Sequence, residues 1–185
     1  MTHAFDYDLA FSRNIGWFTE DEQRQLKEKR VAIAGLGGVG GSHVVTLARM
    51  GITKFNVADF DLFACENTNR QVGANVDTYD APKLDTMVNM AKAINPEIDI
   101  RTFPQGINEE NTGAFLQDVD CYVDSLDFFA MPPRITVFDK CVEKNIPSLT
   151  AAPIGMGTAY INFMPGDMTF EEHFGMKGLS ENEQF

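Results

Sequence analysis

Val31-Ala-Ile-Ala-Gly35-Leu-Gly37-Gly38-Val-Gly40-Gly41 is the stretch that decides the fold. Its first four residues are apolar and predict a short buried strand. Gly35, Gly37 and Gly40 fit the pattern Gly-x-Gly-x-x-Gly, and the apolar positions over 44–48 predict a helix directly after it. Such glycines let the backbone approach a phosphate, and the helix N-terminus offers free N–H groups and a partial positive charge. The stretch therefore predicts a phosphate-binding strand–loop–helix unit.

A carboxylate follows the next predicted strand. The predicted strand Phe55–Ala58 ends at Asp59, which lies 24 residues after Gly35. An acid at this place can hydrogen-bond the ribose hydroxyls of an adenine nucleotide. The alternative interpretation of the same residues is a tight turn without a ligand. With Asp59 in place we favour a nucleotide site, although this unit alone does not separate NAD from ATP.

The rest of the chain alternates helices and strands. Thr19 and Glu22 have the spacing of a capping box and predict a helix over 20–29, and Pro82 suits the first turn of a helix that continues to Ile94. Further strands are expected over 98–103, over 121–124 and from 147, with helices over 109–117 and from 132. This alternation predicts an α/β, Rossmann-like, doubly wound and mostly parallel sheet with an N-terminal helical arm.

The expected organisation is an arm and helix over 1–30, a nucleotide-binding domain over 31–165 and a tail over 166–185, which would open a truncated second half. The 185 residues suffice for one domain, and 44% hydrophobic with 23% charged residues is ordinary for a globular protein. A net charge of −12 makes nucleic acid an unlikely partner, because that affinity comes from clustered Lys and Arg. No apolar run reaches the length of a membrane span, so we expect a cytoplasmic protein.

The segment 60–81 has no hydrophobic period, which is unusual for a connection and suggests a functional loop. It contains Asn67 and Arg70, Lys83 follows it at the start of a helix, and Asp127 follows the strand over 121–124. A dinucleotide does not need this set. A triphosphate undergoing substitution does, because cations hold its oxygens and a carboxylate binds Mg²⁺. Taken singly, these residues are also compatible with a solvated lysine, a surface ion pair and a helix cap.

Taken together, these features resemble the ThiF/MoeB/ubiquitin-activating superfamily over residues 9–163. The matching positions are Ser12-Arg13-Asn14, the Gly-x-Gly-Gly-x-Gly loop, Asp59-x-Asp61, Asn67-x-x-Arg70-Gln71, Lys83, Asn95-Pro96 and Asp124-x-x-Asp127. The resemblance implies ATP-dependent adenylation of a carboxylate, with the C-terminus of a ubiquitin-like or sulfur-carrier protein as the expected acceptor. In this reaction the carboxylate attacks the α-phosphorus and pyrophosphate leaves.

The resemblance also implies a role for each matching residue. Gly38, within the loop of Gly35, Gly37 and Gly40, would touch the phosphates, and Asp59 with Asp61 would bind the ribose side of ATP. Asn67, Arg70 and Lys83 would hold the triphosphate, and Asp127 would bind Mg²⁺. Arg13 would reach the ATP site of the neighbouring subunit in a homodimer. The implied catalytic residues are thus Arg13, Arg70, Lys83 and Asp127.

Several departures keep other interpretations open. Phe128 follows Asp127 where the family has Asn, and the chain lacks the Cys-x-x-Cys pairs of many members. The loop 67–71 also resembles that of the tRNA threonylcarbamoyladenosine dehydratases, and a non-catalytic nucleotide-binding partner subunit remains an alternative. Cys121 and Cys141 are expected in the core, which leaves Cys65 as the cysteine to test for reactivity. An NAD-dependent oxidoreductase would need a substrate domain for which the chain has no room.

Overall fold

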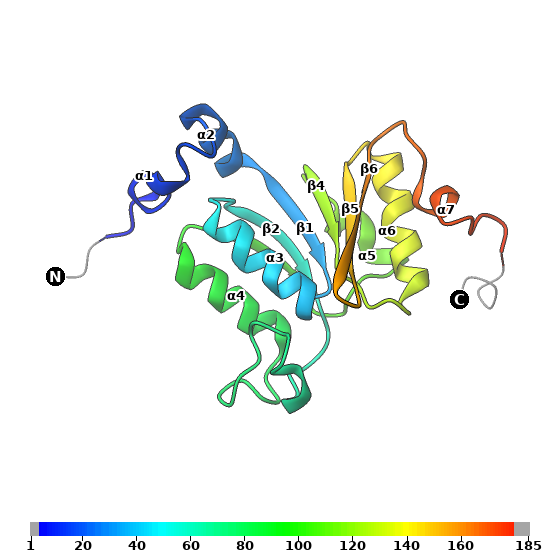
Figure 1. The fold of residues 1–185 in the computed structure, drawn as a ribbon, viewed down its shortest axis with the longest axis horizontal. Helices are drawn as coiled ribbons and strands as arrows, with labels where there is room; N and C mark the ends of the chain where they lie inside the picture. Colours follow the sequence, from blue (N-terminus) through cyan, green and yellow to red (C-terminus); the bar gives the residue numbers. More distant parts are fainter. Residues whose placement is uncertain (1–3, 180–185) are drawn as a thin grey trace.

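The computed structural model describes residues 4–179, and its centre is a six-stranded sheet in the order β3-β2-β1-β4-β5-β6 (Figure 1). The strands are β1 (Arg30–Ala34), β2 (Lys54–Ala58), β3 (Asp99–Phe103), β4 (Cys121–Asp124), β5 (Ser148–Ile154) and β6 (Gly157–Phe163). All neighbouring strands run parallel except β5 and β6, which are antiparallel. The predicted doubly wound, mostly parallel sheet is confirmed.

Helices cover both faces of this sheet. Helices α3 (Gly38–Arg49) and α4 (Lys83–Ile94) lie on one face over β1, β2 and β3, while α5 (Glu109–Phe115) and α6 (Met131–Glu143) lie on the other (Figure 1). The chain builds outward from β1 to β3 and then crosses back to β4 on the other side of β1. This reversal opens a crevice at the carboxyl ends of β1 and β4, where ligands bind in open α/β sheets.

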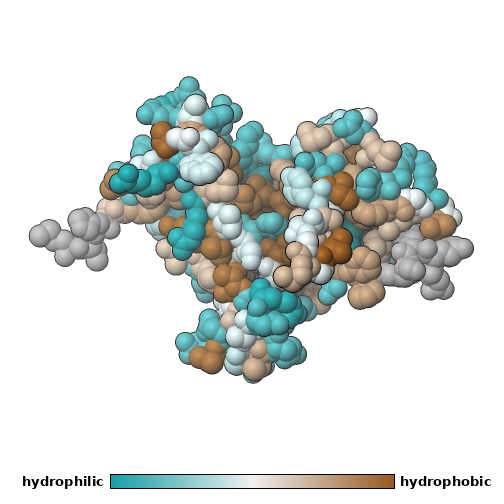
Figure 2. Space-filling view, in the orientation of Figure 1, coloured by the Kyte–Doolittle hydropathy of each residue, from teal (hydrophilic) through white to brown (hydrophobic). Residues whose placement is uncertain are grey.

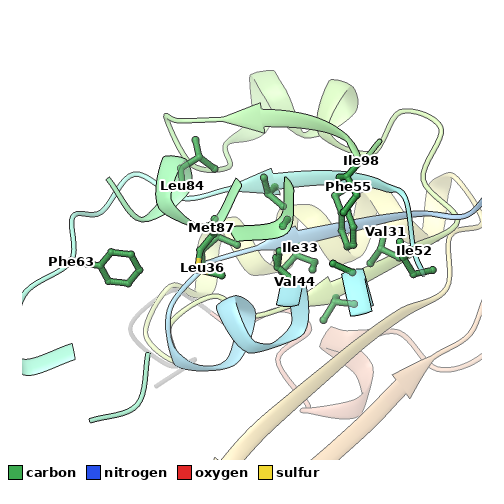
Figure 3. Close-up of a cluster of buried hydrophobic side chains, with 14 of the residues drawn as sticks. Val31, Ile33, Leu36, Val44, Ile52, Phe55, Phe63, Leu84, Met87 and Ile98 are labelled. Atoms are coloured by element: carbon green, nitrogen blue, oxygen red, sulfur yellow. The ribbon is translucent and has the colours of Figure 1, made fainter. Parts of the chain in front are cut away.

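Two hydrophobic clusters form the core. Ile33 and Val31 point into the cluster beneath α3 and α4, together with Phe55 and Met87 (Figure 3), whereas Ala32 and Ala34 face the cluster around Tyr122 and Phe138. All five residues of β1 are buried. A parallel strand covered on both faces has a continuous apolar run rather than an alternating pattern, which is why Val31–Ala34 are all apolar.

The N-terminal arm packs on its own domain at the amino-terminal edge of the sheet. It consists of α1 (Tyr7–Ala10), a 3₁₀ turn η1 (Ser12–Asn14) and α2 (Glu20–Glu28), which begins with the predicted Thr19–Glu22 capping box. The hydroxyl of Tyr7 donates to the carbonyl oxygen of Gly51 at 2.7 Å, so the arm is tied to the end of α3. Trp17 remains 89% exposed and Leu9 74% exposed. The arm thus buries only part of its apolar surface.

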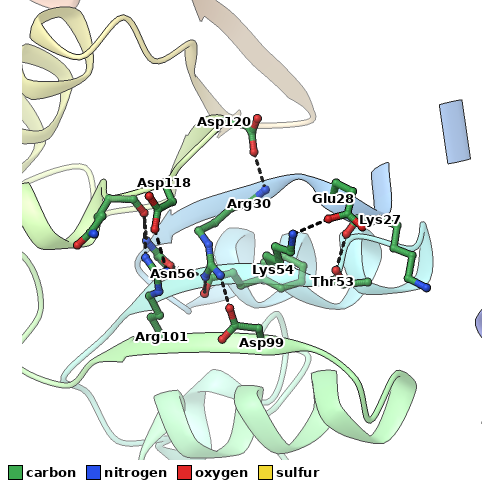
Figure 4. Close-up of polar contacts among 12 residues, drawn as sticks. Lys27, Glu28, Arg30, Thr53, Lys54, Asn56, Asp99, Arg101, Asp118 and Asp120 are labelled. Carbon is green, nitrogen blue, oxygen red and sulfur yellow. Dashed lines mark hydrogen bonds and ion pairs between the residues drawn. The ribbon is translucent and has the colours of Figure 1, made fainter. Parts of the chain in front are cut away.

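The amino-terminal edge of the sheet carries a polar cluster centred on Arg30, whose exposed fraction is 4% (Figure 4). Its Nη1 donates to Asn56 Oδ1 at 2.9 Å and to the carbonyl oxygen of Phe55 at 3.2 Å, and its Nη2 pairs with Asp99. The backbone N–H of Arg30 donates to Asp120 at 2.8 Å. These contacts join β1 to β2, to β3 and to the start of β4, so they stabilise the strand register from the end opposite the glycine loop.

The C-terminal part differs most from the sequence expectation. The strand expected from residue 147 continues to Ile154 and turns back as β6, which the sequence did not predict. A short helix follows, α7 (Phe170–His173), and it begins at the capping residue Thr169. Phe170 is buried and stacks on Phe138, with ring centroids 4.4 Å apart. Within 4–179, no helix has the length and apolarity to cross a membrane.

Candidate functional site

The carboxyl ends of β1, β2 and β4 meet at one place. Ala34 is paired with Ala58 on one side and with Asp124 on the other. Just beyond, the N–H of Gly35 donates to the carbonyl oxygen of Ala58 at 2.8 Å, and the N–H of Ser125 donates to that of Ala34 at 3.0 Å. The glycine loop, the β2–α4 connection and the β4–α6 turn therefore start side by side.

The glycine loop needs glycine at two of its positions for steric reasons. Gly35 has φ +84°, and a Cβ on it would lie 2.3 Å from the carbonyl oxygen of Ser125. A Cβ on Gly40 would lie 1.8 Å from the carbonyl oxygen of Gly35. Gly37 is the N-cap of α3, and no side chain within the described residues caps this helix. The first N–H groups of α3 thus lack a side-chain acceptor, as a phosphate site requires.

Asp59 lies against this loop. Its Oδ2 accepts from the N–H of Leu36 at 2.6 Å, and its Oδ1 accepts from the N–H of Asp61 at 2.8 Å. Burial raises the pKa of Asp59, and the two N–H groups together with the Lys83 ammonium offset this only in part. The carboxylate is thus fixed beside the first turn of the loop, where a ribose hydroxyl can reach it.

The segment Asn67–Gln71 covers the other side of the glycine loop. Asn67 is buried and its Oδ1 accepts from the N–H of Ala64 at 2.8 Å, so its role in this structure is to cap the η2 turn (Cys65–Asn67). The aliphatic part of Arg70 lies beside Gly38, with its Cγ 3.5 Å from where a Cβ would stand. Among the described residues, its guanidinium donates only to neutral oxygens, those of Glu66 and Asn69. No carboxylate within 4–179 neutralises it, so its charge is available to an anion.

Lys83 begins α4 and its ammonium is held at the same edge. The side chain is buried, and its Nζ lies 2.9 Å from Oδ2 of Asp61. The backbone N–H of Lys83 also donates to the carbonyl oxygen of Asp61 at 2.9 Å. A pocket opens next to this pair, lined by Asp59, Phe60, Asp61, Leu62, Pro82, Leu84, Asp85 and Pro104. A partly exposed carboxylate therefore holds a buried cation beside a pocket.

Asp127 lies in the turn after β4. Its carboxylate makes no hydrogen bond or ion pair with the rest of the described chain, although its backbone carbonyl accepts from Ala130 and from Arg134. No group of three or more His, Cys, Asp or Glu side chains suited to a metal occurs in the part that the structure describes. Mg²⁺ differs from zinc in this respect, because it commonly uses one or two carboxylates and takes its other ligands from phosphates and water. A single free carboxylate beside a phosphate loop fits that donor set.

Arg13 is the predicted site residue that the structure does not bring to this place. Its neighbour Asn14 donates to the carbonyl oxygen of Met50, at the far end of α3 from the glycine loop. The 12 residues of α3 span about 18 Å. Arg13 thus lies at the opposite edge of the sheet from the site of its own chain.

Arg134 is a residue of this region that the sequence analysis did not single out. It lies on α6 with an exposed fraction of 8%, and its Nε is 2.9 Å from Oδ2 of the buried Asp124. A sequence signal did exist, since Arg134 shares one helical stripe with the core residues Val137, Phe138 and Cys141. A charge on an apolar stripe indicates a buried partner.

Two of the three cysteines are poor candidates for nucleophilic chemistry. Cys141 is fully buried, as expected, whereas Cys121 is only half-buried and lies outside the core clusters. Burial raises the pKa of both thiols. Thiols that resist ionisation are poor nucleophiles. Cys65 is exposed in the β2–α4 connection.

Phe128, the departure from the family pattern, is exposed and meets Phe129 edge to face, with ring centroids 5.3 Å apart.

The chain is similar to several known proteins. A family model described as the ThiF family matches residues 11–184. The tRNA threonylcarbamoyladenosine dehydratase of Bacillus subtilis (strain 168) is 29% identical over 160 residues, which are 86% of this chain and 62% of that protein. The molybdopterin-synthase adenylyltransferase of Escherichia coli (strain K12) is 29% identical over 150 residues, 80% of this chain and 59% of that protein. The chain spans about three fifths of the length of these relatives.

Solved structures show the same fold. E. coli tRNA N6-threonylcarbamoyladenosine dehydratase in complex with ATP matches with a TM-score of 0.75 at 23% identity, over 81% of this chain and 61% of that one. E. coli MccB with MccA-N7isoASN matches with a TM-score of 0.77 at 25% identity, over 91% of this chain and 51% of that one.

Proposed function

Since the chain belongs to the ThiF family, we propose that it uses ATP and Mg²⁺ to adenylate a carboxylate. The observation that carries the proposal is the meeting of an unneutralised Arg70 and a buried Lys83 with the glycine loop. This arrangement offers two cations and a row of backbone N–H groups to one polyphosphate. The triphosphate of ATP carries more negative charge than the diphosphate of a dinucleotide and is the better match for two cations.

In this proposal each residue of the site has one role. The N–H groups at the start of α3 bind phosphate oxygens, and Asp59 binds the ribose hydroxyls. Arg70 and Lys83 stabilise the charge that builds up around the α-phosphorus, and Asp127 would hold Mg²⁺ against the phosphates. An oxygen of the substrate carboxylate forms a bond to the α-phosphorus as the bond to the leaving pyrophosphate breaks. The product is an acyl adenylate, and the protein contributes mainly positioning and charge.

Nucleotide choice is tested by thermal unfolding with Mg-ATP and with NAD. A ligand at a hundredfold excess over its Kd stabilises the native state by about 2.7 kcal/mol, so Mg-ATP should raise the Tm and NAD should not. Asp127→Ala should keep its Tm without ligand and lose the Mg²⁺-dependent part of the shift. A Tm increase with NAD and none with Mg-ATP would reverse the proposal.

The acceptor is proposed to be the C-terminus of a ubiquitin-like or sulfur-carrier protein. Molybdopterin-synthase adenylyltransferase and sulfur carrier protein ThiS adenylyltransferase, both of E. coli, are relatives of this kind at 29% identity. The net charge of −12 supports a protein acceptor over an RNA. The second candidate, dehydration of a carboxylate-bearing tRNA base, is favoured by the names of two relatives at 29% and 30% identity.

Exchange of labelled pyrophosphate into ATP separates these candidates. We expect the acceptor carboxylate to start the exchange, so it is measured with small carrier proteins and, separately, with tRNA bearing threonylcarbamoyladenosine. Exchange with tRNA alone would establish the second candidate. Loss of exchange in Arg70→Ala in both reactions would link the activity to this site.

We further propose a homodimer in which Arg13 completes the partner's ATP site. Arg13 lies about one helix length from its own glycine loop. The arm exposes apolar side chains, and a second apolar surface lies on β5 and β6. Helices α3 and α4 leave the front of these two strands uncovered, and Figure 2 shows apolar side chains in that region. The register puts Leu149, Ala151 and Tyr160 on this face, and Tyr160 is exposed. An apolar surface of this kind suits a subunit interface.

A further inference from the structure

Arg134 makes an unusual set of contacts with the turn that carries Asp127. Its Nη2 donates to the carbonyl oxygens of Leu126 at 2.6 Å and of Asp127 at 3.1 Å, and its Nη1 donates to that of Phe128 at 3.2 Å. Three successive peptide groups therefore share one guanidinium. Within the same turn, the N–H of Ala130 donates to the carbonyl oxygen of Asp127 at 3.0 Å.

The guanidinium is itself held in place. Its Nε lies 2.9 Å from Oδ2 of Asp124, which is 1% exposed at the end of β4. Thr150 on β5 donates to the same oxygen at 2.9 Å, while the N–H of Leu126 donates to Oδ1 at 3.3 Å. A buried carboxylate with these donors is a fixed anchor, so Arg134 connects the end of the central sheet to the turn.

This geometry acts directly on Asp127. The Cα of Asp127 stands between two peptide groups, and the carbonyl oxygens of both are bound by the same Nη2. Holding both flanking peptide planes fixes the direction of the Cα–Cβ bond between them. The carboxylate of Asp127 has no other partner among the described residues to orient it. The orientation of the Asp127 carboxylate therefore depends on Arg134.

We propose that Arg134 is a positioning residue that sets the Asp127 carboxylate for the metal, an inference that rests on the function proposed above. It touches neither the nucleotide nor the metal. Its effect is exerted through the backbone of the turn, and the planar fork of Arg is needed because a lysine ammonium cannot bind three carbonyl oxygens in this geometry and Asp124 as well. Partners that orient a metal ligand typically change metal affinity by about 10–100-fold when they are mutated.

The test is Mn²⁺ binding, followed by the electron paramagnetic resonance of free Mn²⁺ with saturating α,β-methylene-ATP. This readout requires neither the acceptor nor turnover. Arg134→Lys keeps the charge beside Asp124 but loses the fork, and we expect its Mn²⁺ affinity to fall at least tenfold. Arg30→Lys is the matched control, because Arg30 is an equally buried arginine paired with an aspartate on the same sheet, at the edge remote from the site. Both variants should have a lower Tm than wild type, but only Arg134→Lys should have a lower affinity for Mn²⁺.

If Arg134→Lys does not fold, Arg134→Met combined with Asp124→Asn removes both buried charges and should show the same loss of Mn²⁺ affinity. Equal Mn²⁺ affinity in wild type and Arg134→Lys, or equal losses in Arg134→Lys and Arg30→Lys, would overturn the inference. Asp127→Asn separates it from the proposed function. If Asp127→Asn has a lower Mn²⁺ affinity and Arg134→Lys does not, only the positioning role is refuted. If Asp127→Asn has wild-type affinity, the assignment of Asp127 as a metal ligand is refuted as well.

Discussion

Gly40 lies at the tightest contact of the phosphate loop, since a Cβ there would be 1.8 Å from a backbone oxygen. Gly40→Ala must shift the loop, and we expect it to lower the free energy of unfolding by about 1–3 kcal/mol and to abolish the Mg-ATP-induced increase in Tm. Urea unfolding and thermal shift measure the two effects. Gly113 in α5 is the control, because a Cβ there meets nothing within 4 Å. Gly113→Ala should raise the free energy of unfolding by about 0.5–1 kcal/mol. A normal Mg-ATP-induced increase in Tm in Gly40→Ala would contradict the prediction that the glycine loop binds the phosphates.

Asp120, at the opposite edge of the sheet, contributes to the free energy of unfolding in a pH-dependent way. Burial alone would raise the pKa of Asp120, but the N–H of Arg30 and the ammonium of Lys29 outweigh it and lower the pKa. A carboxyl with a lowered folded-state pKa adds stability that is complete above its unfolded pKa of about 3.9 and is lost as the pH falls through the folded value. The difference in unfolding free energy between wild type and Asp120→Asn should therefore be constant from neutral pH down to about 5 and shrink below about 4. Urea titrations over that range measure it, and a difference that grows on acidification would show the sign to be wrong.

Several residues that the sequence analysis singled out lie together in the structure. The glycines, Asp59, Arg70 and Lys83 all come together as expected, because the carboxyl ends of neighbouring parallel strands share one edge. Arg134 was missed because its partner Asp124 is ten residues away along the chain and meets it only through the packing of α6 on β4. The apolar stripe on α6 indicates that Arg134 is buried, but sequence spacing does not identify Asp124 as its partner.

At the scale of elements, α7 is a four-residue helix that contributes to the core through one ring. Phe170 stacks on Phe138 and also contacts Phe163 on β6. Phe170→Ala should cost about 3–5 kcal/mol, as is typical for a buried aromatic. Phe174 is partly exposed, so Phe174→Ala is the control and should cost less than half as much. Equal losses in chemical denaturation would mean that α7 does not depend on the Phe170 stack.

The sequence predicted the buried parallel strands and the longer helices well, since these have continuous apolar runs or clear periods. It did not predict β6. Gly155, Gly157 and the nearby Pro153 suggest a loop, and several of the strand's side chains face solvent. An antiparallel edge strand is stabilised by pairing with β5 rather than by its own pattern, so its formation depends on tertiary context.

At the scale of the whole molecule, the proposed dimer makes a complementation prediction. Arg13→Ala and Asp127→Ala chains are each expected to be inactive alone. The two are mixed, and subunit exchange is verified before activity is measured. If Arg13 acts on the partner's site, a heterodimer has one site with both lesions and one with neither, and pyrophosphate exchange should recover toward half of the wild-type value per heterodimer. If Arg13 acts within its own chain, every site stays defective. No recovery would refute the proposed role of Arg13.

The position of β1 has a consequence for synthesis of the chain. β1 is buried at the centre of the sheet, yet Val31 pairs with Cys121, ninety residues later. At about 5–20 residues per second, the ribosome needs roughly 5–20 s to add those residues. During that interval β1 presents an apolar strand with one unpaired edge, which is a template for wrong pairing. Nascent chains stalled before residue 121 should therefore bind chaperones, and release from them should coincide with the emergence of β4.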